Sequence, residues 1–229
     1  MKVPVISISV FSMLLCACEC RRPAEAEKTE DNLDKSTEVS DSGKQAEWIE
    51  PFKDKEKWKV YPDYVDVERG YNEMLIQFDD QLAGVIWQGE LPQAPYELEY
   101  DARRVSGSDF FASLTFPLRT DEEIVTLVLG GWGGGTVGIS SIDRKDASEE
   151  ENPTHQIIIF KDEVWYKVRV VVTKEKLKVR IDDKEIINLK LEEQHFAVRP
   201  GLIESFVPLS FTTWQTDGQI KNLRWRSLK

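Results

Sequence analysis

Apolar and polar residues alternate along most of this chain with a period of two, which is typical of β-strands with one buried face. The run YELEYDARR at 96–104 places aromatic and aliphatic residues on one face and Glu97, Glu99 and Asp101 on the other. The run FFASLTF at 110–116 follows a short turn and alternates in the same way. Two such runs joined by a short turn predict a β-hairpin.

Further runs of this kind continue to the end of the chain. The run EIVTLVLGG at 123–131 is apolar on both faces and predicts a central strand, whereas KLKVRIDDKEIINLKL at 176–191 predicts a hairpin. Ten or more strands with almost no 3.6-residue period predict two packed antiparallel sheets. The alternation predicts these buried core residues: Tyr96, Leu98, Tyr100, Leu114, Phe116, Leu127, Tyr166, Val168, Val179, Ile181, Phe211 and Leu223.

Several of these runs also carry a family resemblance, namely PYELEYDARR, GSDFFASLTFP, LVLGGWGGGTVGISSID, WYKVRV and IDDKEII. Together they resemble the 3-keto-disaccharide hydrolase-like domains of bacterial envelope proteins, from Trp58 to Lys229. The resemblance implies an all-β fold, a concanavalin A-like jelly-roll sandwich of two antiparallel sheets, and a carbohydrate ligand. It carries no family catalytic motif over to this chain position by position.

The charge of the chain argues against nucleic acid as a partner. The formal net charge is −11, and short basic runs such as Arg103-Arg104 lie among carboxylates, whereas binding to a phosphate backbone needs a basic stripe. The three cysteines all lie at positions 16, 18 and 20. The rest of the chain therefore has no disulfide framework.

The N-terminal region predicts export and lipid attachment. Residues 1–17 have the short apolar core of a signal peptide, and Leu15-Cys16-Ala17-Cys18 is similar to a bacterial lipobox in which Cys18 is lipidated. An ordinary secreted protein cleaved nearby is the alternative. Residues 18–46 are acidic and poor in large apolar side chains, which predicts a disordered tether, and residues 47–229 form the predicted jelly-roll domain. We expect membrane contact through the lipid only, with the domain in the periplasm or at the cell surface.

The acidic strand contains the candidate catalytic residues. Successive positions on one strand face lie roughly 6.5 to 7 Å apart, so two of the carboxyls of Glu97, Glu99 and Asp101 could approach the separation of about 5 to 5.5 Å that retaining glycosidases use. The spacing is similar to the acidic strand of laminarinase-type β-glucanases, although their aspartate lies between two glutamates. The alternative is that the three carboxylates pair across strands with Lys167, Arg169 or Arg103.

The candidate substrate-binding residues are aromatic, amide and charged side chains near turns. Trp132 lies in the glycine-rich run LGGWGGGTVG and offers a flat face on which a sugar ring can stack. A turn with a packing tryptophan is the alternative. The full set of candidates is Arg103, Asp109, Trp132, Asp143, Trp214 and Gln215.

No cofactor is expected from the sequence. The two histidines have no spacing typical of a transition-metal site. Asp143 with Asp146, or Asp182 with Asp183, are the candidate ligands for calcium, but no EF-hand-like run accompanies them.

Two functional hypotheses follow. In the first, the domain hydrolyses a 3-keto-disaccharide or a glucan, which requires one carboxyl with a raised pKa beside an ionised one. In the second, it is a tethered carbohydrate-binding or interaction module without turnover. The hydrolase and the carbohydrate-binding module both require a saccharide ligand.

The lipobox-like run makes a first prediction that can be tested. Metabolic labelling with a fatty acid should label the wild-type chain and not the Cys18→Ala variant, because the thiol is the acceptor. Cys16→Ala, two residues away, is the matched control and should still be labelled. Equal labelling of the wild type and Cys18→Ala would contradict the prediction.

Overall fold

A computed structural model describes residues 46–78 and 81–229. The predictions for 1–17, for Cys18 and for the tether up to residue 45 concern residues outside this range. The described residues belong to one compact unit, Gly43–Lys229. Among them, no helix combines the length and the apolar character needed to cross a membrane.

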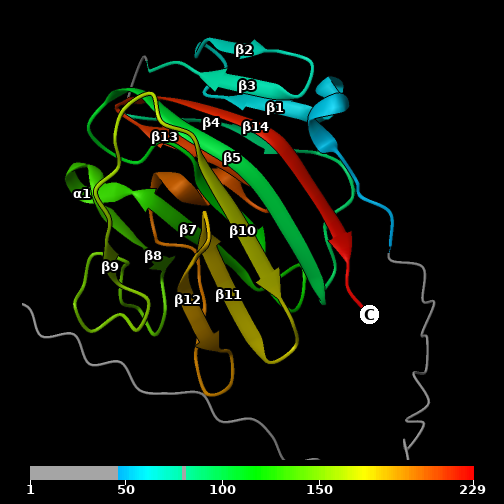
Figure 1. The fold of residues 1–229 in the computed structure, drawn as a ribbon, viewed down its shortest axis with the longest axis vertical. Coiled ribbons are helices and arrows are strands. Elements are labelled where there is room, and N and C mark those ends of the chain that lie inside the picture. Colours follow the sequence, from blue (N-terminus) through cyan, green and yellow to red (C-terminus); the bar gives the residue numbers. More distant parts are fainter. Residues whose placement is uncertain (1–45, 79–80) are drawn as a thin grey trace, which may run out of the picture. The chain divides into compact units, whose positions relative to one another are not determined.

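Two antiparallel seven-stranded sheets face each other (Figure 1), which confirms the predicted all-β sandwich. We call the sheet with the order β12-β11-β10-β5-β14-β3-β2 the front sheet, and the sheet with the order β1-β4-β13-β6-β7-β8-β9 the back sheet. The strands are β1 Trp58–Tyr61, β2 Val67–Arg69, β3 Glu73–Ile76, β4 Leu82–Trp87, β5 Tyr96–Gly107, β6 Ser113–Pro117, β7 Ile124–Gly130, β8 Thr136–Ser140, β9 Gln156–Ile157, β10 Tyr166–Val172, β11 Lys176–Ile181, β12 Lys184–Lys190, β13 Ser210–Trp214 and β14 Thr216–Ser227. The helical turns are η1 Pro51–Lys53, η2 Lys55–Lys57, α1 Gly131–Gly134 and η3 Leu202–Phe206.

The predicted hairpin between 96–104 and 110–116 is wrong, because β5 and β6 belong to different sheets. The turn between them is a corner of the sandwich. The apolar faces of both strands point into the space between the sheets, where the Tyr100 hydroxyl donates a 3.3 Å hydrogen bond to the Ala112 carbonyl and the Tyr96 hydroxyl bonds to the Pro117 carbonyl. Alternation alone does not distinguish a partner beside a strand from a partner across the core.

The other strand predictions agree with the structure. Strand β7 is buried along most of both faces, between β6 and β8, and β11 and β12 form the predicted antiparallel hairpin with its turn at Asp182. Strand β10 pairs with β5 and buries Val168 and Val170 while Arg169 faces away from the core.

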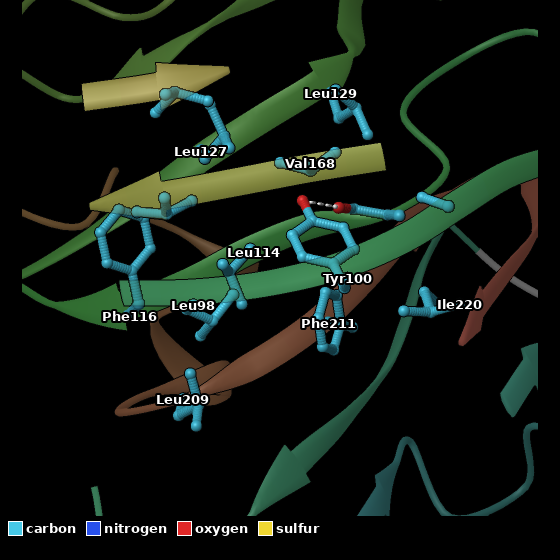
Figure 2. Packing of buried hydrophobic residues seen from close by; sticks show 14 of the residues in the cluster. Leu98, Tyr100, Leu114, Phe116, Leu127, Leu129, Val168, Leu209, Phe211 and Ile220 are labelled. Carbon is cyan, nitrogen blue, oxygen red and sulfur yellow. Dashed lines mark hydrogen bonds between the residues drawn. The ribbon is translucent and has the colours of Figure 1, made fainter. Parts of the chain in front are cut away.

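The core lies between the sheets and is rich in aromatic side chains. Figure 2 shows Tyr100 close to Phe211, whose ring centroid lies 4.9 Å away, with Leu98, Leu114 and Phe116 in the same layer. Eleven of the twelve predicted core residues are buried. Tyr166 is the exception: it is partly buried at the start of β10, where its hydroxyl accepts a hydrogen bond from the Lys161 backbone N–H.

The burial of Leu98 leads to a prediction about the free energy of unfolding. Leu98 is completely buried near the start of β5, so Leu98→Ala removes buried methyl groups and leaves a cavity. We expect the free energy of unfolding to fall by about 2 to 5 kcal/mol, measured by denaturant unfolding. Val164→Ala, at a side chain that is 40% exposed, is the control and should cost under about 1 kcal/mol. A cost this small for Leu98→Ala would contradict the packing.

Candidate functional site

The candidate site is a pocket of about 240 Å³ on the face of the back sheet that points away from the core. Three hydroxyl side chains from β6, β7 and β8 form its floor, aromatic side chains stand at its rim, and the segment 199–203 covers it. Its lining residues are Leu82, Phe110, Ser113, Thr126, Val128, Trp132, Ser140, Arg199, Pro200, Leu202, Ile203 and Trp214.

The floor follows directly from strand alternation. Leu114 and Leu127 enter the core, so Ser113 and Thr126 must point to the opposite face. Thr115, Thr126 and Ser140 are neighbours across β6, β7 and β8 in the strand register, and the hydroxyl oxygens of Thr115 and Thr126 lie 2.9 Å apart. The buried hydroxyls of Thr115 and Thr126 are thus hydrogen-bonded to each other across the strands, as buried polar groups usually are.

Trp132 is held at the rim by an unusual turn between β7 and β8. Gly130 and Gly133 have φ angles of 83° and 89°, and Trp132 itself has φ 47° and ψ 58°, in the left-handed region. A bulky residue rarely adopts this conformation, and such residues are often found at functional sites. Trp132 is 44% exposed.

Asp109 fixes this turn from the neighbouring chain segment. One carboxylate oxygen accepts a 3.2 Å hydrogen bond from the Gly133 N–H, and the other accepts a 2.8 Å bond from the Phe110 N–H. Asp109 and Trp132 also line a second hollow of about 220 Å³, which shares Phe110, Arg199 and Trp214 with the main pocket. The structure therefore brings together three sequence candidates, Asp109, Trp132 and Trp214.

Arg199 closes the pocket from above. Its guanidinium group lies 5.5 Å from the centroid of the Trp132 ring, and its Nε lies 2.9 Å from Asp146 Oδ2. The other oxygen of Asp146 accepts a 3.0 Å hydrogen bond from the Ser140 hydroxyl on the floor. One carboxylate thus connects the covering segment to the sheet beneath it.

The acidic strand lies on the other side of the sandwich, on the outer face of the front sheet. Glu97 is 1% exposed and forms ion pairs with Arg169 on β10 and Arg226 on β14. Glu99 is 7% exposed, and its Oε2 lies 2.7 Å from Arg224 Nη2. Two strands rich in basic residues therefore flank β5 and pair with it.

The pairs with β10 are those that the sequence offered as the alternative to catalysis. Lys167 and Arg169 lie 3.7 and 3.6 Å from the Glu99 carboxylate. Asp101 accepts a 2.7 Å hydrogen bond from the Asn222 amide. None of the three carboxylates lines the pocket of Trp132, but Glu99 and Asp101 line a separate polar hollow of about 240 Å³.

The ionisation of Glu97 follows from these contacts. Burial acts to raise the pKa of its carboxyl group, but the hydrogen bonds and charges of Arg169 and Arg226 outweigh this effect and leave the pKa below the ordinary value. Glu97 is therefore ionised near neutral pH. A carboxylate in this state is suited to holding arginines and not to donating a proton.

The remaining candidates lie apart from the pocket. Arg103 is on the outer face of the front sheet, with its Nη1 2.6 Å from Glu163 and its guanidinium over the Trp165 ring. Asp143 accepts a 2.9 Å hydrogen bond from the His195 N–H, and this bond lowers the pKa of the Asp143 carboxyl group. Gln215 is exposed just after Trp214, at the end of β13.

The calcium candidates do not form a ligand cluster. Asp146 pairs with Arg199, and Asp182 accepts a 2.9 Å hydrogen bond from the Lys167 N–H. Within 46–78 and 81–229, no group of three or more acidic, histidine or cysteine side chains is placed to hold a metal ion.

Sequence reasoning missed the floor and the cover of the pocket. Ser113 had a local signal, since it alternates with Leu114 and Phe116, but hydroxyls on a strand face do not by themselves indicate a site. Thr126 lies in a run that is apolar on both faces. Arg199 lies in a loop without periodicity, so only the folded chain shows that it reaches Trp132.

Comparisons with known proteins show the fold. No family model matches the chain, and no curated protein matches it. The Crh5 transglycosylase in complex with NAG is 11% identical, with a TM-score of 0.55 over 81% of this chain and 85% of that chain. A mutant of the Emp46p carbohydrate recognition domain is 9% identical, with a TM-score of 0.50 over 78% and 91% of the two chains. The fold is a concanavalin A-like jelly roll, as expected.

The ion pairs of Glu97 predict a stability that depends on pH. Glu97→Gln leaves two arginines without their carboxylate, so we expect the free energy of unfolding at pH 7 to fall by roughly 1.5 to 3 kcal/mol, as measured by denaturant unfolding. The folded-state pKa is lowered, so the stabilisation is present above the ordinary value of about 4.5 and is lost as the pH falls through the folded-state value.

The difference between wild type and Glu97→Gln should therefore shrink on acidification. Glu150→Gln, which removes an exposed carboxylate in a loop, is the control and should change stability little at any pH. A difference between Glu97→Gln and wild type that stays constant from pH 7 down to the acid transition would count against the ion pairs.

Proposed function

We propose that this domain binds a saccharide, without turnover, in the pocket beneath Arg199. The observation that carries the proposal is the combination of aromatic rim and hydroxyl floor in one pocket. Trp132 and Trp214 present flat apolar faces of the kind on which sugar C–H groups stack, and Ser113, Thr126 and Ser140 lie where polar groups of a ligand can exchange hydrogen bonds.

The charge of the pocket favours a ligand that binds through shape and hydrogen bonds. Arg199 is the cationic residue that lines the pocket, and its charge is already paired with the carboxylate of Asp146. Asp109 is the one carboxylate among the described residues that line the two connected hollows, and both of its oxygens accept backbone hydrogen bonds. Glycoside hydrolysis typically needs two carboxyl groups on either side of the scissile bond. The described lining supports binding better than hydrolysis.

The ligand class rests on resemblance. The sequence is similar to 3-keto-disaccharide hydrolase-like domains, and the solved structures that share the fold include a transglycosylase in complex with NAG and a carbohydrate recognition domain. We therefore propose a 3-keto-disaccharide or a glucan as the ligand. The likeness in fold supports this choice and does not identify the sugar.

Hydrolysis is the second candidate function, and it is supported by one observation on the front sheet. Glu99 and Asp101 open onto a polar hollow with Lys167, Asn222 and Arg224. Glu99 is the carboxylate to test there, because Glu97 is ionised between two arginines. If this hollow carried chemistry, the catalytic site and the tryptophan pocket would be on opposite sheets.

The place of action is also a proposal. The lipobox-like run around Cys18 and the acidic, weakly apolar segment that follows support a domain that is exported, lipid-anchored and held off the membrane by a tether. Such a domain would meet saccharides in the cell envelope.

Truncation of Trp132 tests the pocket. The unit 43–229 has its own core, and we would titrate it with 3-keto-disaccharides and plain glucans by calorimetry while following product release. Trp132→Ala should weaken binding about tenfold, because a stacking contact of roughly 1.4 kcal/mol is lost. Trp165→Ala, on the front sheet, is the matched control and should bind like wild type.

The same titrations separate the two functions. For a binding module, Glu99→Gln leaves affinity within about twofold and no ligand is turned over. Product release that disappears in Glu99→Gln would replace the binding proposal with hydrolysis on the front sheet. Wild-type affinity in Trp132→Ala would show that the pocket is not the binding site.

A further inference from the structure

The outer face of the front sheet is basic along β5, β10, β11 and the end of β14, although the chain as a whole has a net charge of −11. Along β5, β10, β11 and the end of β14, the register places three carboxylates on this face and three times as many cationic side chains. The carboxylates are Glu97, Glu99 and Asp101, and the cationic residues are Arg103, Lys167, Arg169, Lys176, Lys178, Arg180, Lys221, Arg224 and Arg226. The neighbouring strands β3 and β12 add Glu73 opposite Lys221 and Glu185 opposite Arg180.

The carboxylates cannot neutralise this face. Glu97 and Glu99 are already shared among several arginines and Lys167. The positive charge that remains is concentrated towards the turn between β10 and β11. There, four lysines and one carboxylate line a shallow hollow of about 680 Å³, together with Pro95, Val171 and Thr173. The lysines are Lys174, Lys176, Lys178 and Lys229, and the carboxylate is that of Glu175.

These four lysines, which we call the lysine cluster, form no ion pair with any residue in 46–78 or 81–229. Their ammonium groups therefore keep their donors for another partner. A basic surface of this kind on an otherwise acidic protein creates a charge asymmetry that orients the molecule at an anionic surface.

The start of the described chain lies on the same face. The Trp48 ring lies 4.2 Å from the Arg224 guanidinium and 4.4 Å from that of Arg226, and Ile49 pairs with Trp225 through two backbone hydrogen bonds. The chain thus enters the domain beside the basic face. The saccharide pocket proposed above lies on the outer face of the back sheet.

We propose that the lysine cluster and the basic face around it dock on an anionic lipid bilayer. The phosphate groups of the lipids would accept hydrogen bonds from the lysine ammonium groups, and the negative surface potential would attract the arginines nearby. The lipid anchor proposed at Cys18 would deliver the domain to this surface through the chain that enters at Trp48. Docking in this orientation leaves the pocket of the back sheet facing away from the bilayer.

Vesicle co-sedimentation of the unit 43–229, which has no lipid anchor, tests the proposal. Vesicles containing 30% phosphatidylglycerol should bind the domain at low salt, and pure phosphatidylcholine vesicles should not. The triple variant Lys174→Gln, Lys176→Gln and Lys178→Gln should lose roughly fivefold in partition coefficient for each lysine. The matched control changes Lys59, Lys145 and Lys161 to Gln, which alters the net charge equally outside the cluster, and should lose less than threefold in total.

Several outcomes would overturn the proposal. These are absence of binding to the anionic vesicles, equal losses in the two triple variants, or capture by soluble heparin without capture by vesicles, which would indicate a polyanion in place of a bilayer. Loss of vesicle binding with retained saccharide affinity in the cluster variant would support docking. A failure of saccharide binding in the wild type would leave the vesicle result unaffected, because the two faces are assayed separately.

Discussion

The packing of β5 against the back sheet is the constraint on which the rest of this structure depends. Tyr96, Leu98 and Tyr100 enter the core completely, and the two tyrosine hydroxyls bond to backbone carbonyls of the segment that leads into and out of β6. Because these residues bury one face of the strand in the core, Glu97 and Glu99 must point to the outer face of the sheet. They lie between two strands that supply arginines, and these arginines stabilise the carboxylates as anions. A single alternating run therefore determines both the core and the charge pattern of the front face.

This explains which parts of the fold could be predicted from the sequence. Alternation identifies the buried face of a strand, so the β11–β12 hairpin, the burial of β7 and nearly all of the core residues could be read from the residues alone. It does not identify the partner of a strand. The sequence predicts a hairpin at the corner between β5 and β6, because a short turn between two alternating runs can join two neighbouring strands of one sheet or two strands of opposite sheets. The choice depends on how the aromatic side chains of both strands fit across the core.

The candidate site was less predictable for a related reason. Trp132 stands out in the sequence as a tryptophan among glycines, and Asp109 as an aspartate in a turn. In the structure Asp109 accepts a hydrogen bond from the N–H of Gly133, the residue after Trp132, and both line one hollow. The residues that make a pocket around them come from five strands and from the segment that contains Arg199. No local pattern links position 199 to position 132, because the link exists only after the back sheet has formed. For the acidic strand, the local pattern is clear from the sequence and suggests catalytic carboxylates. Only the structure shows that the neighbouring strands supply cationic partners for these carboxylates.

The bridge formed by Asp146 has a consequence for how this pocket can change. Its carboxylate accepts a hydrogen bond from the Ser140 hydroxyl and pairs with the Arg199 guanidinium, so one polar side chain sets the distance between this guanidinium and the floor, while backbone hydrogen bonds between Ser141 and Ala197 and the apolar packing of Ile203 hold the rest of the cover. The aromatic walls belong to other segments. A longer or shorter residue at position 146 or 199 would therefore change the space for a ligand on the side of the pocket where Arg199 lies. Evolution or design could retune ligand size at these two positions while leaving the tryptophans and the sheet unchanged.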